Sequence, residues 1–204
     1  ITEQFEKFGA SIIRVVPKGL RGPPTETAIL TKKDVETVKK VKGLDYVAEL
    51  LLQNEKVEYN NKENLVLIQS LPPELAKEAF RDLNLEIGEG RNLEKGDSDV
   101  AVVGATIGED MFGKEIRVKN SIKIVEKKFR IIGTLKEAGT LGTDQIIFIP
   151  IETAREIFDK PESISIIAAK VQEGLDVRTV SDKVEDELKR ARDDENFEVT
   201  TPEQ

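Results

Sequence analysis

Hydrophobic and polar residues follow two different periods along this chain, and the period changes twice. Near the amino end, the β-branched run "SIIRVV" (residues 11–16) predicts a strand. Residues 31–43, "TKKDVETVKKVKG", predict a helix, because valines recur every three positions on one face. Thr31 and Asp34 have the spacing of a capping box at its start, and Gly43 supplies a natural stop.

The next segment predicts a hairpin followed by a helix. Residues 44–60 have the composition of a long, irregular strand, and residues 65–71 of a returning one, with "NNKEN" as the turn between them. The proline pair at 72 and 73 then opens a helical pattern that runs to about Asp82.

Residues 84–150 have a different sequence pattern from the rest of the chain. The apolar segments are shorter, glycines are clustered, and apolar residues recur mainly every second position. Residues 99–104 predict a buried strand, and residues 105–113 a short helix that ends at a glycine. "EIRVKN" (115–120) and "SIKIVEKKFRIIGTL" (121–135) alternate apolar and polar residues. This alternation predicts an antiparallel sheet with one solvated face.

After Pro150 the longer period returns. Residues 151–158 predict a helix, residues 163–171 a strand, and residues 176–192 the most amphipathic helix of the chain. A last short strand is expected at 197–201.

The two ends of the chain therefore have similar patterns of strands and helices. Together they can form a single β-α-β layer that is divided in the sequence by the middle segment. We expect an α+β fold with a mixed α/β subdomain formed by residues 1–83 and 151–204. Residues 84–150 are expected to form a β-rich insertion.

Composition excludes several kinds of chemistry. The 204 residues are 38% hydrophobic and 34% charged, which is enough to bury a core, and the net charge of -8 disfavours a nucleic-acid binder. Histidine and cysteine are both absent. This excludes Ser-His-Asp and Cys-His nucleophiles and zinc sites built on thiolate or imidazole ligands.

Apolar runs such as "IIFIPI" fall far short of the roughly 18 residues that a membrane span requires. The chain begins at Ile1 without a signal-peptide pattern. We expect it to be a segment of a longer protein.

Two motifs point to catalysis only weakly. "GEGRN" (88–92) resembles a nucleotide-binding loop, but the third glycine is missing and position 93 is leucine. Walker-type Gly-Lys-Ser/Thr is also absent, so we interpret the motif as a turn. Ser121 and Lys123 form a possible Ser-Lys pair, but no S-x-x-K motif frames a nucleophile.

Clustered carboxylates are the remaining candidates. Asp97 and Asp99 form a D-x-D pair, but further oxygen ligands at fixed spacing are missing, so turn chemistry explains them better than a metal. "GED" (108–110) and "RDDE" (192–195) place carboxylates next to each other in the sequence. The two members of a catalytic acid/base pair must face each other across a pocket, and sequence neighbours rarely do. We interpret these two clusters as solvated faces and expect no cofactor and no metal.

The segment "KEAGTLGTDQ" (136–145) contains two glycines and small polar residues. Such a segment is either an ordinary hairpin connection or an exposed loop that contacts a partner or substrate. The candidate contact residues are Glu137, Gly139, Thr140, Leu141, Gly142 and Thr143.

Taken in order, "GEGRNLEKGDSDVAVVGATIGEDMFG" and "IKIVEKKFRIIGTLKEAGTLGTDQIIFIPIETA" resemble the extracytoplasmic core domain of MacB-type ABC transporter permeases of the FtsX-like superfamily. The likeness covers essentially the whole chain. The chain departs from the family pattern in one place. The family has a glycine-led segment before its second strand, and this chain has "EIRVKNSIKI" there.

The resemblance implies a porter-like subdomain made by both chain ends and an inserted sabre-like subdomain. It implies a position on the extracytoplasmic face, between the first two of four transmembrane helices, and a homodimeric permease with a separate cytoplasmic ATPase. It also implies a domain without catalysis of its own, which relays ATP-driven movement or contacts a substrate or partner protein.

The alternative is an independent secreted binding module or a small carboxylate-based hydrolase. The first hypothesis predicts that both chain ends lie on one side of the fold. The second predicts termini that point apart, or a pocket in which Asp97, Asp99, Glu109 or Asp110 converge.

Overall fold

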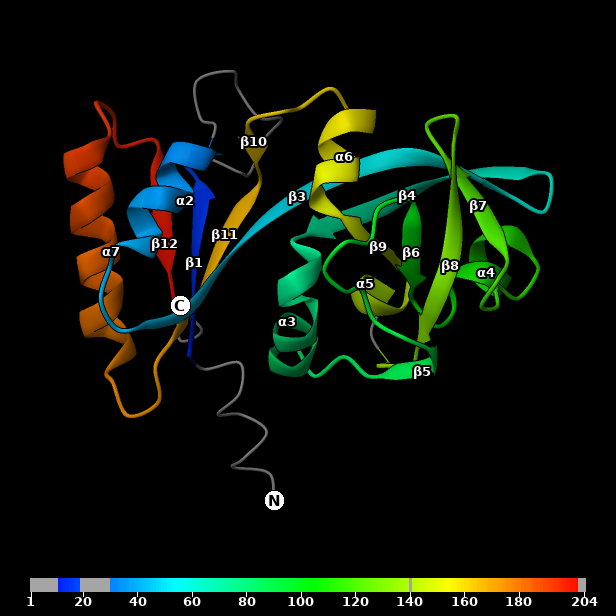
Figure 1. Ribbon diagram of the computed structural model, residues 1–204, viewed down its shortest axis with the longest axis horizontal. Coiled ribbons are helices and arrows are strands. Elements are labelled where there is room, and N and C mark those ends of the chain that lie inside the picture. The colour runs from blue at the N-terminus through cyan, green and yellow to red at the C-terminus, as the bar shows by residue number, and fades with distance from the viewer. Residues whose placement is uncertain (1–10, 19–29, 140, 202–204) are drawn as a thin grey trace. The chain divides into compact units, whose positions relative to one another are not determined.

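The computed structural model describes residues 11–18, 30–139 and 141–201, and the chain forms two compact units (Figure 1). The terminal unit consists of Ile1–Leu50 with Glu162–Gln204, and the central unit of Leu51–Pro161. Described segments from the first and last parts of the chain therefore belong to one unit. Among the described residues, no helix is both long and apolar enough to cross a bilayer.

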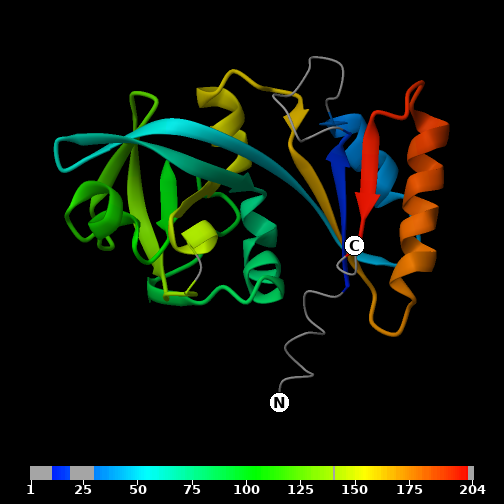
Figure 2. The ribbon, with the colours of Figure 1, turned by 180° about the vertical axis from the view of Figure 1, so that it is seen from behind.

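The terminal unit is a sheet with helices on one face (Figures 1 and 2). Its described elements are β1 (Ile12–Pro17), β2 (Leu30–Thr31), α2 (Lys32–Lys39), the first half of β3 (Leu44–Tyr59), β10 (Ser163–Ile164), β11 (Ile166–Val171), α7 (Val177–Ala191) and β12 (Phe197–Thr200). The strand order is β12-β1-β11-β3, with antiparallel neighbours throughout. β2 and β10 form a separate antiparallel pair.

The core of the terminal unit lies between this sheet and its two helices. Alternate residues of β1 and β11 face helix residues spaced three or four apart, which is the match that a strand and an amphipathic helix require. The main contributors are Ile13, Val15, Val35, Val38, Ile167, Ala169, Val180, Val184 and Leu188. Fully burying one such side chain contributes about 1.5–3 kcal/mol.

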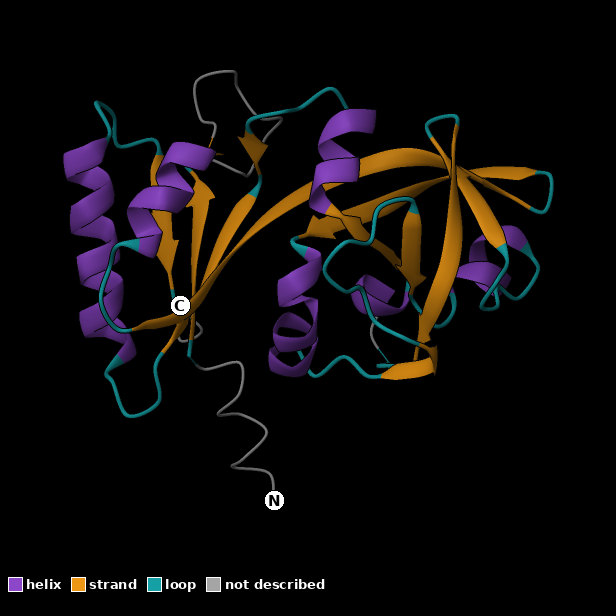
Figure 3. Cartoon of the chain, in the orientation of Figure 1, coloured by secondary structure: helices purple, strands orange, loops and turns teal. Residues whose placement is uncertain are grey.

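The central unit contains all of residues 84–150, the predicted β-rich segment, and is built mainly of strands (Figure 3). Its elements are the second half of β3, then β4 (Lys62–Leu71), the 3-10 helix η1 (Pro73–Leu75), α3 (Ala76–Asp82), β5 (Ile87–Gly90), β6 (Val100–Val103), α4 (Ile107–Phe112), β7 (Ser121–Ile124), β8 (Lys127–Leu135), α5 (Leu141–Asp144), β9 (Ile146–Pro150) and α6 (Ile151–Ile157).

The strands of the central unit close into a ring. β3, β4, β9, β6 and β8 are neighbours in that order, and β7 pairs with both β8 and β3. Inward-facing side chains from all six strands fill the ring, as in a small barrel. Examples are Val57, Ile68, Val103, Ile124, Phe129 and Ile149, all within 1% of complete burial.

Several predicted elements are confirmed with small changes of length. The helix predicted over 31–43 is α2, which ends at Lys39, short of Gly43. The predicted β3–β4 hairpin turns at Asn60 and Asn61, both of which have positive φ (53° and 57°). The helix predicted over 105–113 ends at Gly113 in the left-handed conformation (φ 66°).

Other predictions are wrong in detail. Residues 115–120 form no strand, contrary to expectation, but contain a turn at Val118 and Lys119, where the side chain of Asn120 accepts a hydrogen bond from Arg117 N at 2.9 Å. The single strand expected over 163–171 is divided at Ser165, whose N–H bonds to Leu50 O. The strands of the central unit were expected to be antiparallel, but β6–β8 and β4–β9 are parallel pairs, so the pairing there is mixed.

The compact units divide the chain at 50/51 and 161/162, whereas the expected subdomain limits were 83/84 and 150/151. The difference arises because the second half of β3, together with β4 and α6, supplies residues such as Val66 and Ala154 to the central core. Assignment of the porter-like and sabre-like subdomains to 1–83 with 151–204 and to 84–150 stays a prediction.

Candidate functional site

The segment 136–145 connects β8 to β9 and is the exposed loop that the sequence singles out; we call it the contact loop. It leaves β8 next to an ion pair between Lys136 Nζ and Glu86 Oε2 at 2.6 Å. The hydrogen bond from Lys136 lowers the pKa of Glu86. The loop then forms the single turn of α5 before β9 begins.

Asp144 anchors the contact loop from within. Its side chain is 3% exposed, and its two carboxylate oxygens accept hydrogen bonds from the N–H groups of Ala138 (2.8 Å) and Gly139 (2.9 Å). Its backbone oxygen accepts a further bond from Thr106 N. A buried carboxylate that accepts backbone N–H groups holds a loop in one conformation.

Gly104 lets the contact loop approach the end of β6. A Cβ atom on Gly104 would lie 2.3 Å from the backbone oxygen of Asp144 and 2.5 Å from its carbonyl carbon. Gly104 N also donates to Ile146 O. Only glycine therefore fits at position 104 without moving the loop.

The structure places the candidate contact residues as follows. Glu137, Gly139 and Gly142 are exposed, and Thr143 is half-buried. Leu141 begins α5, and Thr140 lies outside the described residues. Contact of this loop with a partner or substrate stays a prediction.

The candidate carboxylates are engaged separately with different neighbours. Asp97 forms two hydrogen bonds with the Arg91 guanidinium, at 2.7 and 2.8 Å, and this interaction lowers the pKa of Asp97. Asp99 instead pairs with Lys127 Nζ at 2.9 Å. Each aspartate thus has its own cationic partner.

The carboxylates on α4 lie in other surroundings. Asp110 accepts a hydrogen bond from Gln145 Nε2 at 3.1 Å, and Glu109 is exposed in the first turn of the helix. Within the described part of the chain, no group of three or more acidic residues is arranged to hold a metal ion.

Ser121 and Lys123 line an open groove of 490 Å³ beside the β3–β4 and β7–β8 turns. The ammonium group of Lys123 binds Glu126 at 2.7 Å and Glu58 at 3.6 Å. These carboxylates, Glu126 foremost, raise the pKa of Lys123. Pairing with two carboxylates favours the cationic form of Lys123, the form that cannot accept a proton from Ser121.

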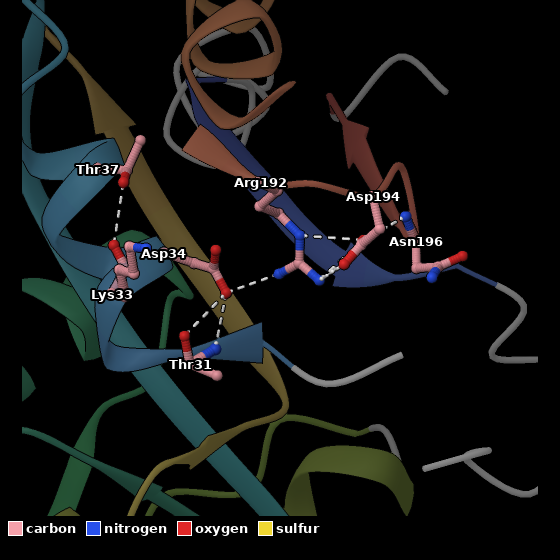
Figure 4. Close-up of polar contacts among 7 residues, drawn as sticks. All are labelled: Thr31, Lys33, Asp34, Thr37, Arg192, Asp194 and Asn196. Atoms are coloured by element: carbon pink, nitrogen blue, oxygen red, sulfur yellow. Dashed lines mark hydrogen bonds and ion pairs between the residues drawn. The ribbon is translucent and has the colours of Figure 1, made fainter. Parts of the chain in front are cut away.

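An ionic cluster in the terminal unit, in which the Arg192–Asp34 pair is largely buried, was not foreseen from the sequence (Figure 4). Arg192 Nη1 donates to Asp34 Oδ2 at 2.7 Å, and Arg192 Nη2 donates to both oxygens of Asp194 at 3.0 Å. The interpretation of residues 192–195 as a solvated face is wrong for Arg192, whose side chain is only 11% exposed, whereas the side chain of Asp194 stays 41% exposed while it binds Arg192. Asp193 and Glu195 are exposed as expected.

The sequence does carry one signal for this cluster. Asp34 is recognisable as the capping-box residue of α2, and its Oδ2 accepts from Thr31 N at 2.8 Å. A carboxylate buried at a helix start has room for a cationic partner, but the pattern does not show that this partner is Arg192.

Comparison with known proteins places this chain in a family. Residues 1–187 match the family described as the MacB-like periplasmic core domain. The chain is 33% identical over 204 residues to an uncharacterised ABC transporter permease of Methanocaldococcus jannaschii, covering 51% of that protein. It is 24% identical over 197 residues to the macrolide export ATP-binding/permease protein MacB of Bdellovibrio bacteriovorus, covering 30% of that protein.

Solved structures agree on the fold. The periplasmic region of MacB from Actinobacillus actinomycetemcomitans superposes with a TM-score of 0.81 at 15% identity, covering 98% of this chain and 92% of that one. The extracellular domain of the noncanonic ABC-type transporter YknZ from Gram-positive bacteria superposes with a TM-score of 0.73 at 14% identity. The superposition covers 93% of this chain and 100% of that one. The expected mixed α/β architecture is confirmed.

Fold and sequence together define an extracytoplasmic domain of an ABC transporter permease. The chain belongs to the MacB-like periplasmic core domain family, which lies on the outer side of the membrane and is a transporter domain without a catalytic role of its own. It spans about half the length of the first relative and under a third of the second.

Proposed function

We propose that this domain relays ATP-driven conformational change of a permease to the extracytoplasmic side, and that its contact loop meets a substrate or partner protein. The observation that carries the relay is the pairing of β1 with β12. These strands are antiparallel neighbours, with Arg14 opposite Thr200 and Pro17 opposite Phe197.

Antiparallel pairing places the start of β1 and the end of β12 at the same end of the sheet. The described strands β1 and β12 are therefore neighbours at the same end of the sheet, which supports the permease hypothesis; Ile1 and Gln204 themselves lie outside the described residues. Two connections that meet on adjacent, hydrogen-bonded strands can move a packed unit as a rigid body.

The partners follow from the family. We infer a cytoplasmic ABC ATPase that acts through membrane-spanning parts of the full-length permease, and a homodimer of that permease. We infer no nucleic-acid partner, since the net charge is -8.

A linker insertion tests the relay. Six Gly/Ser residues are inserted after Thr201 in the full-length permease, reconstituted with its ATPase in nanodiscs. Hydrogen exchange of the contact loop is then compared without nucleotide and with trapped ATP. The relay predicts a nucleotide-dependent change that the insertion abolishes, because a flexible linker cannot transmit displacement.

The matched control carries the same insertion at Gly174, an exposed position in the β11–α7 connection where an added Cβ would meet nothing within 4 Å. This control should keep the nucleotide-dependent change. An equal response to ATP with and without the Thr201 insertion would show that displacement does not pass through the connection after β12, and would overturn this route for the relay.

A further inference from the structure

β12 is held weakly by its backbone alone. It is a four-residue strand at the edge of the described sheet, where β1 is its neighbour. Short edge strands with one neighbour open more readily than central strands. A strand that transmits displacement under the proposed function needs a further attachment.

Arg192 supplies that attachment between the end of α7 and the start of β12. It follows the last residue of α7 with an extended backbone (φ -102°, ψ 149°). Its Nε and Nη2 bind Asp194, and Asp194 Oδ1 in turn accepts Asn196 N at 2.9 Å, directing the chain into the strand. The guanidinium carbon also lies 5.8 Å from the ring centroid of Phe197, the first residue of β12.

The other edge of the guanidinium reaches α2. Arg192 Nη1 binds Asp34 Oδ2, and the side chains of the pair are only 11% and 6% exposed. The same oxygen accepts both the N–H and the hydroxyl of Thr31, at 2.8 and 3.2 Å. Asp34 is thereby fixed to the start of α2 by Thr31, independently of its bond with Arg192 (Figure 4).

We propose that Arg192 is a positioning residue that fastens β12 to helix α2, so that displacement of the chain at Thr200 moves the sheet and helices of the terminal unit together. This inference rests on the proposed relay and names the residue through which force passes from the last strand. A planar guanidinium spans two carboxylates on separate elements, whereas a lysine ammonium is a single point charge.

The test uses Arg192→Lys in the full-length permease, which keeps the charge and removes the fork. Hydrogen exchange is first measured without nucleotide. A single ammonium cannot bind Asp34 and Asp194 together as the guanidinium does, so losing one of the two contacts should speed exchange of residues 193–200 by about tenfold or more. Exchange in α7 and β11 should stay at the wild-type rate, a selectivity that general loss of stability would not produce.

Arg190→Lys is the matched control. Arg190 lies two positions earlier and pairs with Glu187 on the exposed face of the same helix, with side chains 71% and 48% exposed. The same substitution there should leave exchange of residues 193–200 unchanged, since exposed pairs contribute little.

Asp194→Asn is a second variant that keeps an acceptor for Asn196 N and removes the charge that Arg192 binds. It should speed exchange of the same residues while leaving Asp34 and α2 intact. Uniform acceleration over the whole terminal unit in Arg192→Lys and Asp194→Asn, or none, would overturn the proposal.

The nucleotide response then separates this inference from the relay itself. If wild-type permease shows no nucleotide-dependent exchange in the contact loop, the relay fails. If the wild type responds and Arg192→Lys responds equally, the relay stands and the role of Arg192 is wrong. The inference predicts that Arg192→Lys loses most of the response and that Arg190→Lys keeps it.

Discussion

Replacing Asp144 by alanine tests whether the contact loop is held in one conformation by a single buried carboxylate. The substitution removes both acceptors of the Ala138 and Gly139 N–H groups and leaves the backbone bond from Thr106 in place. We expect the loop to open and the central unit to lose stability.

The magnitude follows from the two hydrogen bonds. Bonds to a charged group contribute about 1.5–3 kcal/mol each, so an upper bound is about 3–6 kcal/mol. Ala138 and Gly139 are exposed, so water can solvate the freed N–H groups. We therefore expect a loss of about 2–3 kcal/mol in the free energy of unfolding.

Urea denaturation followed by far-UV circular dichroism measures this loss, since the chain has no tryptophan. Asp144→Asn serves as the control, because it keeps the shape and one acceptor oxygen and should lose about half as much. A change below about 0.5 kcal/mol in Asp144→Ala would refute the anchoring role.

Three further predictions concern the central unit. Gly104→Ala should destabilise by about 2–3 kcal/mol in urea denaturation, because its Cβ would clash with backbone 2.3 Å away. Asp97→Asn should make the free energy of unfolding depend less on pH in acid. Arg91 lowers the pKa of Asp97, so this pairing stabilises the wild type above about pH 4, and the stabilisation is lost as pH falls through the folded-state pKa. Phe129→Ala, at a side chain with 0% exposure, should cost about 3–5 kcal/mol in the same urea assay.

A matched control accompanies Gly104→Ala. Gly142→Ala, where an added Cβ would meet nothing within 4 Å, should leave stability nearly unchanged. Equal losses in Gly104→Ala and Gly142→Ala would contradict the close approach, and equal acid profiles for wild type and Asp97→Asn would contradict the Arg91 pairing.

Local pattern was sufficient for most elements. The valine spacing in α7 and the capping box of α2 each predicted a helix that the structure confirms. Paired asparagines predicted the β3–β4 turn, because Asn tolerates the positive φ that a tight hairpin requires. These signals lie within a few residues of one another.

Pairing between distant segments was not predictable in this way. The ring of the central unit closes because β7 meets β3 at Ile124 and Val57, and alternation within each strand does not specify a neighbour. The bond between Arg192 and Asp34 joins positions 158 residues apart. Burial of Asp144 was likewise hidden, because a polar residue in a glycine-bearing loop is usually solvated.

The most direct test of the relay is a distance measured between the two subunits of the permease. A spin label is attached through Asp186→Cys, an exposed position on α7, and the chain itself has no other cysteine to compete. Pulsed electron paramagnetic resonance compares the label distances without nucleotide and with trapped ATP. The relay predicts a shifted distance distribution in the ATP state, and identical distributions in the two states would contradict it.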